Sequence, residues 1–156
     1  MFNEGIRMRK VGVFLMLLIA METAAMPLTK TCVFSAIKAR ITFNGEPVKQ
    51  AKVIRKWEWK ELREENTQTD DHGYFEFPAA FESSITRLLP VELVIAQGLY
   101  VVVDGEEKKF WSNSKREPDE NAEFNGKPIA LICDLTDEMQ IYRDFGSRMN
   151  TLCRWE

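Results

Sequence analysis

The sequence predicts an all-β protein that folds as one sandwich of about seven antiparallel strands. Short apolar segments alternate with turn-forming residues, a pattern typical of strands rather than helices. Two dipeptides, Asn44-Gly45 and Asp104-Gly105, favour the tight turns that join antiparallel strands. A chain of 156 residues has room for one domain of this kind. The strand number and the spacing of the turns favour a two-sheet sandwich over a barrel.

The first predicted hairpin joins a strand over 39–43 to a strand over 51–59. Alternation with a period of two places four side chains of the second strand on one face: Val53, Arg55, Trp57 and Trp59. The polar residues 60–67 are expected to connect this strand to the next turn.

A structural turn is predicted at Asp70, Asp71 and Gly73, just before a strand over 74–77. Aspartate side chains accept hydrogen bonds from backbone amides one or two residues further on, and glycine tolerates a positive φ. Because residues alternate between the two faces of a strand, both phenylalanines of 74–77 are expected to enter the core.

Four more strands are predicted, over 91–96, 99–103, 108–111 and 128–133. Residues 83–89 are expected to form a short helix or a loop before Pro90. The charged segment 112–127 is expected to be an exposed loop, and a polar C-terminal tail is expected from about 136 to 156.

Residues 1–25 have the layout of a signal peptide. Basic residues precede the apolar run 11–20, and small residues follow it at 23–25. Because this run is shorter than the roughly 20 apolar residues that cross a bilayer, we expect cleavage after Ala25 rather than a membrane anchor. The mature single domain, 26–156, would then be periplasmic or secreted.

Three cysteines, Cys32, Cys133 and Cys153, lie after the predicted signal peptide. An exported protein reaches a compartment where disulfides persist, so one disulfide and one free thiol are expected. We favour Cys133–Cys153, which would hold the tail against the last strand, while a pairing of Cys32 with either stays open. No metal site is expected at these cysteine spacings beside a single histidine, and no cofactor is expected.

The net charge and the motifs of the sequence argue against several classes of function. The net charge is −3, with acidic and basic residues interspersed, so nucleic acid is not an expected partner. His72 is the single histidine and lies in the predicted turn. No nucleophile elbow, phosphate loop or zinc-protease motif occurs in the sequence. We therefore expect a protein without catalytic activity.

The stretch from Ala39 to Pro78 resembles the regulatory-like domain of carboxypeptidases, a transthyretin-like (prealbumin-like) sandwich. The resemblance rests on three segments: Asn44-Gly45-Glu46-Pro47-Val48, Ala51-Lys52-Val53 and Thr69-Asp70-Asp71-His72-Gly73-Tyr74-Phe75-Glu76-Phe77. With Cys32-Val33-Phe34-Ser35 and Leu131-Ile132-Cys133-Asp134-Leu135, the mature chain also resembles small exported bacterial proteins that carry a domain of unknown function. These resemblances imply a transthyretin-like fold and no particular chemistry.

One enzyme family with the transthyretin-like fold, the hydroxyisourate hydrolases, ends in Tyr-Arg-Gly-Ser and uses several site histidines. This chain has Tyr142-Arg143-Asp144-Phe145-Gly146-Ser147, with two inserted residues and a tail beyond the serine. Since His72 is its single histidine, the proton-transfer groups of that family cannot be carried over. A small-molecule hydrolase is therefore the least favoured function.

Four residues are candidates for a binding surface: Trp57, Trp59, Arg55 and Trp111. Aromatic side chains at the end of a strand can stack on sugars or anchor a protein partner. The alternative is that the tryptophans fill the core. We expect an exported binding module whose partner is a protein, as an inhibitor, immunity factor or envelope accessory, with carbohydrate binding or adhesion as the alternative. Edge strands can also pair two chains, so the oligomeric state stays open.

Overall fold

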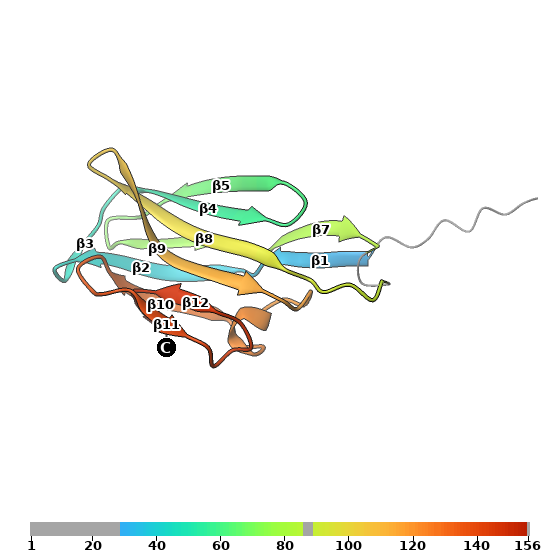
Figure 1. Cartoon of the computed structure of the whole chain (residues 1–156). Coiled ribbons are helices and arrows are strands. Elements are labelled where there is room, and N and C mark those ends of the chain that lie inside the picture. Colours follow the sequence, from blue (N-terminus) through green and yellow to red (C-terminus); the bar gives the residue numbers. More distant parts are fainter. Residues whose placement is uncertain (1–28, 86–88, 156) are drawn as a thin grey trace, which may run out of the picture.

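The computed structural model describes residues 29–85 and 89–155, which contain thirteen strands and one short 3₁₀ helix, η2 (Ala122–Phe124) (Figure 1). The all-β, sandwich-like fold that the sequence predicts is confirmed. The signal peptide predicted for residues 1–25 lies outside the described residues. The strands form three sheets, of six, five and two strands.

The six-stranded sheet is built around the long β8–β9 hairpin, which Figure 1 shows lying across the strands of the five-stranded sheet. Its strands in spatial order are β11 (Gln140–Tyr142), β12 (Met149–Thr151), β9 (Glu106–Lys115), β8 (Ile95–Val103), β4 (Lys52–Glu58) and β5 (Leu62–Gln68). Asp104 and Gly105, at the tip of the β8–β9 hairpin, both have positive φ, as the predicted tight turn requires.

The five-stranded sheet has β2 at its centre. Its strands are β13 (Cys153–Trp155), β10 (Ile129–Asp134), β2 (Ile37–Phe43), β3 (Glu46–Pro47) and β6 (Tyr74–Phe77). All pairs in this sheet are antiparallel except β10 with β2, which is parallel. A parallel pair needs a long connection between its strands, and here the whole β4–β9 region supplies it. The prediction of purely antiparallel strands is wrong for this pair.

The third sheet pairs β1 (Thr29–Phe34) with β7 (Ala80–Ser84). The sequence predicted a short helix or loop over 83–89, but Ser83 and Ser84 belong to β7 and residues 86–88 lie outside the described part. The pairing with β1 is what makes 80–84 a strand, and nothing in the segment itself signals that partner.

The predicted pairing of 39–43 with 51–59 is wrong. The turn at Asn44-Gly45 joins β2 to the two-residue strand β3, whereas 52–58 forms β4 of the six-stranded sheet and pairs with β5 and β8.

Three other predicted boundaries are also wrong. Residues 60–67 were expected to be a connection, but β5 occupies 62–68, with nearly every side chain exposed. The predicted strands 91–96 and 99–103 are replaced by the single strand β8, since Gly98 continues the pairing with β4 and β9. The expected polar tail contains β11, β12 and β13, and it buries Met149, Thr151 and Cys153.

The core lies between the inner faces of the two large sheets. Phe75 and Phe77 of β6 are buried, as predicted, and Phe75 meets Phe110 of β9 edge-on at 6.2 Å between ring centroids. Trp111, the next residue of β9, packs against Phe34 of β1 at 5.6 Å. These contacts join the six-stranded sheet to the other two sheets.

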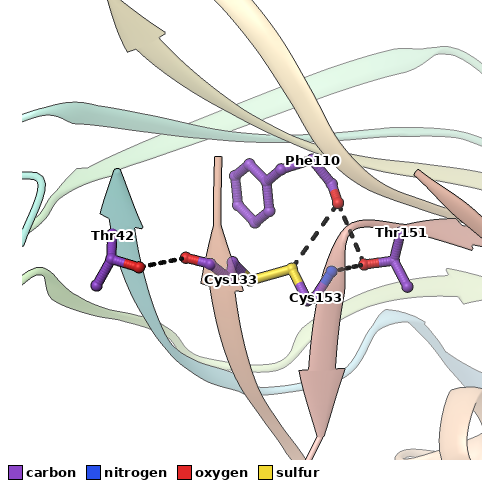
Figure 2. Close-up of a disulfide and its surroundings, with 5 residues drawn as sticks. All are labelled: Thr42, Phe110, Cys133, Thr151 and Cys153. Carbon is purple, nitrogen blue, oxygen red and sulfur yellow. Dashed lines mark hydrogen bonds between the residues drawn. A yellow bond between two sulfur atoms is a disulfide. The ribbon is translucent and has the colours of Figure 1, made fainter. Parts of the chain in front are cut away.

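A disulfide joins Cys133 of β10 to Cys153 of β13, which confirms the predicted pairing (Figure 2). The two cysteines are directly opposite in this antiparallel pair, with 4.1 Å between their Cα atoms. Thr151 donates its hydroxyl to the Phe110 carbonyl at 3.2 Å and accepts from the Cys153 amide at 2.9 Å. The disulfide is therefore held against β9 of the facing sheet. Cys32 is a buried free thiol.

The turn before β6 is organised by Asp70. Its carboxylate accepts hydrogen bonds from the backbone amides of His72 at 2.8 Å and Tyr74 at 2.9 Å. Gly73 has a φ of 81°, and a Cβ at this position would lie 2.4 Å from the Ile41 carbonyl oxygen. The turn thus needs glycine both for its conformation and for its close approach to β2.

Candidate functional site

The structure places two of the three tryptophans proposed for binding inside the molecule. Trp57 is 5% exposed and Trp111 is completely buried, because both point from the six-stranded sheet into the core. Trp59 lies just after β4 and is half-buried, with the Lys60 ammonium 4.4 Å from its ring centroid. Trp57 and Trp111 therefore cannot offer their faces to a ligand in this fold.

Arg55, the fourth of these residues, is also completely buried. Its guanidinium lies 4.7 Å from the ring centroid of Phe77 and 5.2 Å from that of Phe34, at distances typical of cation–π contacts. It donates to the Pro78 carbonyl at 2.6 Å and forms an ion pair with Glu65 of β5. Arg55 thereby ties β5 and the end of β6 to β4, which is a structural role.

One open surface that could accept a ligand is a hollow on the outer face of the six-stranded sheet. It has a volume of about 460 Å³, within the usual range for ligand sites. Its floor is low because β8 and β9 present four small residues outward: Ala96, Gly98, Ser112 and Ser114. Larger polar side chains stand around this floor: Lys56, Glu58, Tyr100, Lys109, Arg148 and Asn150. We call this region the outer hollow.

The register of the sheet brings these residues together. Lys56 of β4 is opposite Gly98 of β8, Gly98 is opposite Ser112 of β9, and Ser112 is opposite Asn150 of β12. Side chains directly opposite on one face of a sheet are neighbours, so one row crosses four strands. Asn150 donates its side-chain amide to the Ser112 hydroxyl at 3.4 Å.

Tyr100 lies against the gap left by Gly98. A Cβ at Gly98 would come within 2.8 Å of the tyrosine ring, so the absence of a side chain there lets the ring lie close to the sheet. The ammonium groups of Lys56 and Lys109 lie 4.9 and 5.3 Å from the ring centroid. Lys56 donates to Glu107 at 2.7 Å, and this hydrogen bond is the main cause of its raised pKa. The aromatic ring is therefore held in position by charged neighbours.

A buried polar cluster lies on the inner side of the same strands. Lys115 of β9 donates to the Glu123 carboxylate at 2.8 Å, and both side chains are at most 1% exposed. Ser35 donates to the same carboxylate with its hydroxyl at 2.5 Å and its backbone amide at 3.1 Å. Gln97 of β8 donates to it at 2.9 Å. The cluster fixes η2 against the two large strands.

The cluster continues toward the C-terminal strands. Asn113 donates its amide to the Gln97 side chain at 3.1 Å and accepts a hydrogen bond from the Ser147 hydroxyl at 2.7 Å. Burial raises the pKa of Glu123, but the Lys115 ammonium and its hydrogen bond, with those of Ser35 and Gln97, outweigh burial and leave that pKa below its ordinary value. The Glu123 carboxylate is thus favoured in its charged form in the interior, where it lies 2.8 Å from the Lys115 side-chain nitrogen.

Sequence reasoning missed this cluster because it treated 112–127 as an exposed loop. That prediction is wrong for Lys115 and Glu123. A usable signal was present in the alternation of β9, where Trp111, Asn113 and Lys115 share the inward face. Lysine and glutamate are rarely buried unless they are paired, so their presence in 112–127 favoured an exposed loop. The pairing of Lys115 with Glu123, which makes their burial possible, is visible only in the folded structure.

Within residues 29–85 and 89–155, no group of three or more histidine, cysteine, aspartate or glutamate side chains is placed to hold a metal ion. The same described residues contain no helix that is long and apolar enough to cross a membrane. Ser35 lies 3.4 Å from the Lys115 ammonium, and both side chains are buried.

Together the sheets and the outer hollow define an all-β, sandwich-like protein with an open polar site on one sheet face. The chain belongs to a family described as a domain of unknown function (DUF6795), whose match covers residues 37–138. The matched region runs from β2 through β10 and contains most of the outer hollow, although Arg148 and Asn150 follow it. No curated protein and no solved structure gives a match to the chain.

Proposed function

We propose that this protein is an exported, non-catalytic binding module that recognises another macromolecule through the outer hollow. The observation that carries the proposal is the ring of Tyr100, held over Gly98 at the edge of a hollow floored by small residues. Such a hollow accepts a protruding group from a partner without rearrangement of the sheet. Tyrosine and arginine are frequent in the energetically important centres of interfaces, and the hollow has both Tyr100 and Arg148.

The proposed partner is a protein, with this module acting as an inhibitor, immunity factor or envelope accessory. Export is supported by the Cys133–Cys153 disulfide, since disulfides persist in oxidising compartments. The sandwich-like arrangement and the turn at Asp70 and Gly73 are compatible with a transthyretin-like fold, which remains part of the proposal. That fold would present its sheet faces to partners and would supply no chemistry by itself.

A carbohydrate partner is the second candidate. The hollow combines one aromatic ring with the hydroxyls of Ser112 and Ser114 and the amide of Asn150, the kinds of groups that stack on and hydrogen-bond to a sugar. Titration of the protein with a set of isolated glycans, followed by tyrosine-sensitive NMR or calorimetry, tests this candidate. A glycan whose binding is kept by Tyr100→Phe and lost in Tyr100→Ala would favour it over a protein partner.

The experiment for the main proposal compares three forms of the mature protein as affinity baits in envelope extracts. These are the wild type, Tyr100→Ala and Ser114→Arg, which fills the hollow without touching the core. A specific protein retained by the wild type and lost from both variants supports the proposal, provided that their circular dichroism is unchanged. A partner retained equally by all three forms would place recognition elsewhere. A hydrolase activity that disappears in His72→Ala would contradict a non-catalytic function.

A further inference from the structure

The outer face of the five-stranded sheet carries a second ordered row of side chains, on the opposite side of the sandwich from the outer hollow. Arg154 of β13 is opposite Ile132 of β10, Ile132 is opposite Arg40 of β2, and Arg40 is opposite Tyr74 of β6. The order across the sheet is therefore cation, aliphatic, cation, aromatic. Lys38, two residues before Arg40 on β2, adds a third cation to the same face.

The cations of this face are weakly neutralised. Lys38 has one carboxylate nearby, Glu76 at 3.8 Å, in a pair whose side chains are 83% and 73% exposed and which contributes little. Arg40 donates to the His72 carbonyl and lies 5.6 Å from the Tyr74 ring centroid, and it forms no ion pair with a carboxylate of residues 29–85 or 89–155. Within the described residues Arg154 has no ion pair. In a chain with a net charge of −3, this is a local excess of positive charge.

The other acidic residue at this face is engaged elsewhere. Asp134 ends β10, and its carboxylate accepts hydrogen bonds from the hydroxyls of Thr136 and Thr42 and from the Gly45 amide. The Thr136 hydrogen bond is the largest cause of a pKa for Asp134 well below its ordinary range. These bonds hold its oxygens toward the β2–β3 turn and Thr136, and among the described residues Asp134 forms no ion pair with Arg40 or Arg154.

Between the cations the face is apolar and hollow. A depression of about 240 Å³ is lined by Lys38, Ala39, Arg40, Tyr74, Ala130, Leu131 and Ile132. Ile132, near the middle of the face, is 37% exposed, and Tyr74, on the edge strand β6, is 54% exposed. Positive side chains around an exposed apolar floor match a ligand that is acidic and carries aliphatic groups.

We propose that this face binds an extended acidic polypeptide segment in which acidic and aliphatic side chains alternate along one side. Side chains on one side of an extended chain are about 7 Å apart, while strands two apart in a sheet are separated by about 10 Å. Acidic groups four residues apart in the ligand can therefore reach the long side chains of Arg40 and Arg154, with an aliphatic residue between them over Ile132. Charge complementarity selects the acidic partner, and the apolar floor favours a polypeptide over a sugar polymer.

The test uses a fluorescein-labelled peptide with glutamate and leucine alternating on one side and serine at every other position. Two control peptides carry lysine in place of glutamate, or the same residues with all glutamates adjacent. Binding is measured by fluorescence anisotropy at low and physiological salt. Dextran sulfate and phosphatidylglycerol vesicles are measured in parallel as anionic ligands of other classes.

The protein variants are Lys38→Gln with Arg154→Gln, and a matched double variant on the other face, Lys109→Gln with Arg148→Gln. All four residues are on the surface, and each double variant removes two positive charges. We expect the patterned peptide to bind the wild type and to bind the Lys38/Arg154 variant roughly tenfold more weakly, as the loss of two exposed ion pairs implies. The Lys109/Arg148 variant should bind within about twofold of the wild type, as expected for surface changes away from the site.

Several outcomes would overturn this inference. One is equal binding of the patterned and lysine peptides, and another is equal weakening by the two double variants, which would show an effect of net charge alone. Tighter binding of dextran sulfate or of the vesicles than of the patterned peptide would replace the polypeptide with another anionic ligand. Because Tyr100→Ala leaves this face intact, the outer hollow can fail as a site without affecting the result.

Discussion

At the scale of single residues, the charges in the interior matter most. Glu123 and Lys115 are buried together, and the carboxylate collects hydrogen bonds from Ser35 and Gln97. Removal of one partner from such a pair leaves the other charge unpaired in a medium that solvates it poorly. The position of η2 therefore depends on the ion pair between Glu123 and Lys115.

We expect Glu123→Gln to lower the free energy of unfolding by about 3–5 kcal/mol, the usual cost of an uncompensated buried charge. Urea denaturation followed by tryptophan fluorescence measures the change. Glu76→Gln is the matched control, since it removes the same charge from an exposed ion pair and should cost less than about 1 kcal/mol. Equal effects of the two changes would contradict the proposed role of the buried pair.

Stability should also fall in acid. Because the pKa of Glu123 is lower in the folded protein than its ordinary value of 4.5, the unfolded chain binds more protons near and below that pH. The stabilising contribution of the ionised Glu123 side chain is therefore complete above about pH 4.5 and is lost as the pH falls through its lowered pKa in the folded protein. Urea midpoints between pH 7 and pH 3 test this, and the slope should be shallower in Glu123→Gln. If the urea midpoints of the wild type and of Glu123→Gln fall in parallel as the pH is lowered, Glu123 is not a cause of the loss of stability in acid.

A glycine pair gives a cleaner residue-scale test. Gly73 and Gly105 have similar positive φ values, 81° and 79°, but only the Cβ at Gly73 would meet another atom, the Ile41 carbonyl oxygen. Both alanine variants incur backbone strain of about 1–2 kcal/mol. Gly73→Ala should cost at least about 1 kcal/mol more than Gly105→Ala because β2 or the turn must shift. Thermal unfolding of the two variants measures the difference.

At the scale of elements, the disulfide holds β13 to the sheet. Cys133 and Cys153 are separated by 20 residues, and closing a loop of this size contributes about 3 kcal/mol in the chain-entropy account. We expect the Cys133→Ala, Cys153→Ala variant to lose about that much stability without loss of the fold. Equilibrium denaturation with and without reductant measures this loss of stability. In the presence of reductant, the wild type should be as stable as the double variant. No effect of reductant on wild type would mean that the bond does not form.

The elements that could be predicted are those whose signal is local. The turns at Asn44-Gly45 and Asp104-Gly105 and the buried phenylalanines of β6 follow from residue type and alternation. β5 could not be predicted in this way, because an edge strand whose side chains face solvent shows no apolar alternation. It is a strand because it pairs with β4 along its whole length, a fact of tertiary structure.

The candidate site was harder to predict than the fold. Trp57 and Trp111 suggested a binding surface, but aromatic content alone does not tell the inward face of a strand from the outward one. The outer hollow depends on small residues, Gly98 and Ser112, whose importance appears only when β8 and β9 are paired. Small residues such as these give no sequence signal that they will line a hollow.

At the scale of the whole molecule, the sandwich has two unlike outer faces. The six-stranded sheet carries the outer hollow, and the five-stranded sheet carries the row of Arg154, Ile132, Arg40 and Tyr74. Both faces are built on paired strands rather than loops, so ligands would meet surfaces fixed in shape before binding. A partner bound at one face leaves the other accessible.

The parallel pairing of β2 with β10 has a consequence for synthesis and for the export that we propose. Residues 37–42 find their partners only at 129–134, so one side of β2 stays bare until nearly the whole chain is available. A contact between such distant residues is slow to form, and an unpaired central strand can associate with other chains. Passage through a membrane in an unfolded state would suit this topology, because β2 and β10 would then pair only on the far side. In an oxidising compartment, the thiols of Cys133 and Cys153 could form their disulfide there as soon as β13 pairs with β10.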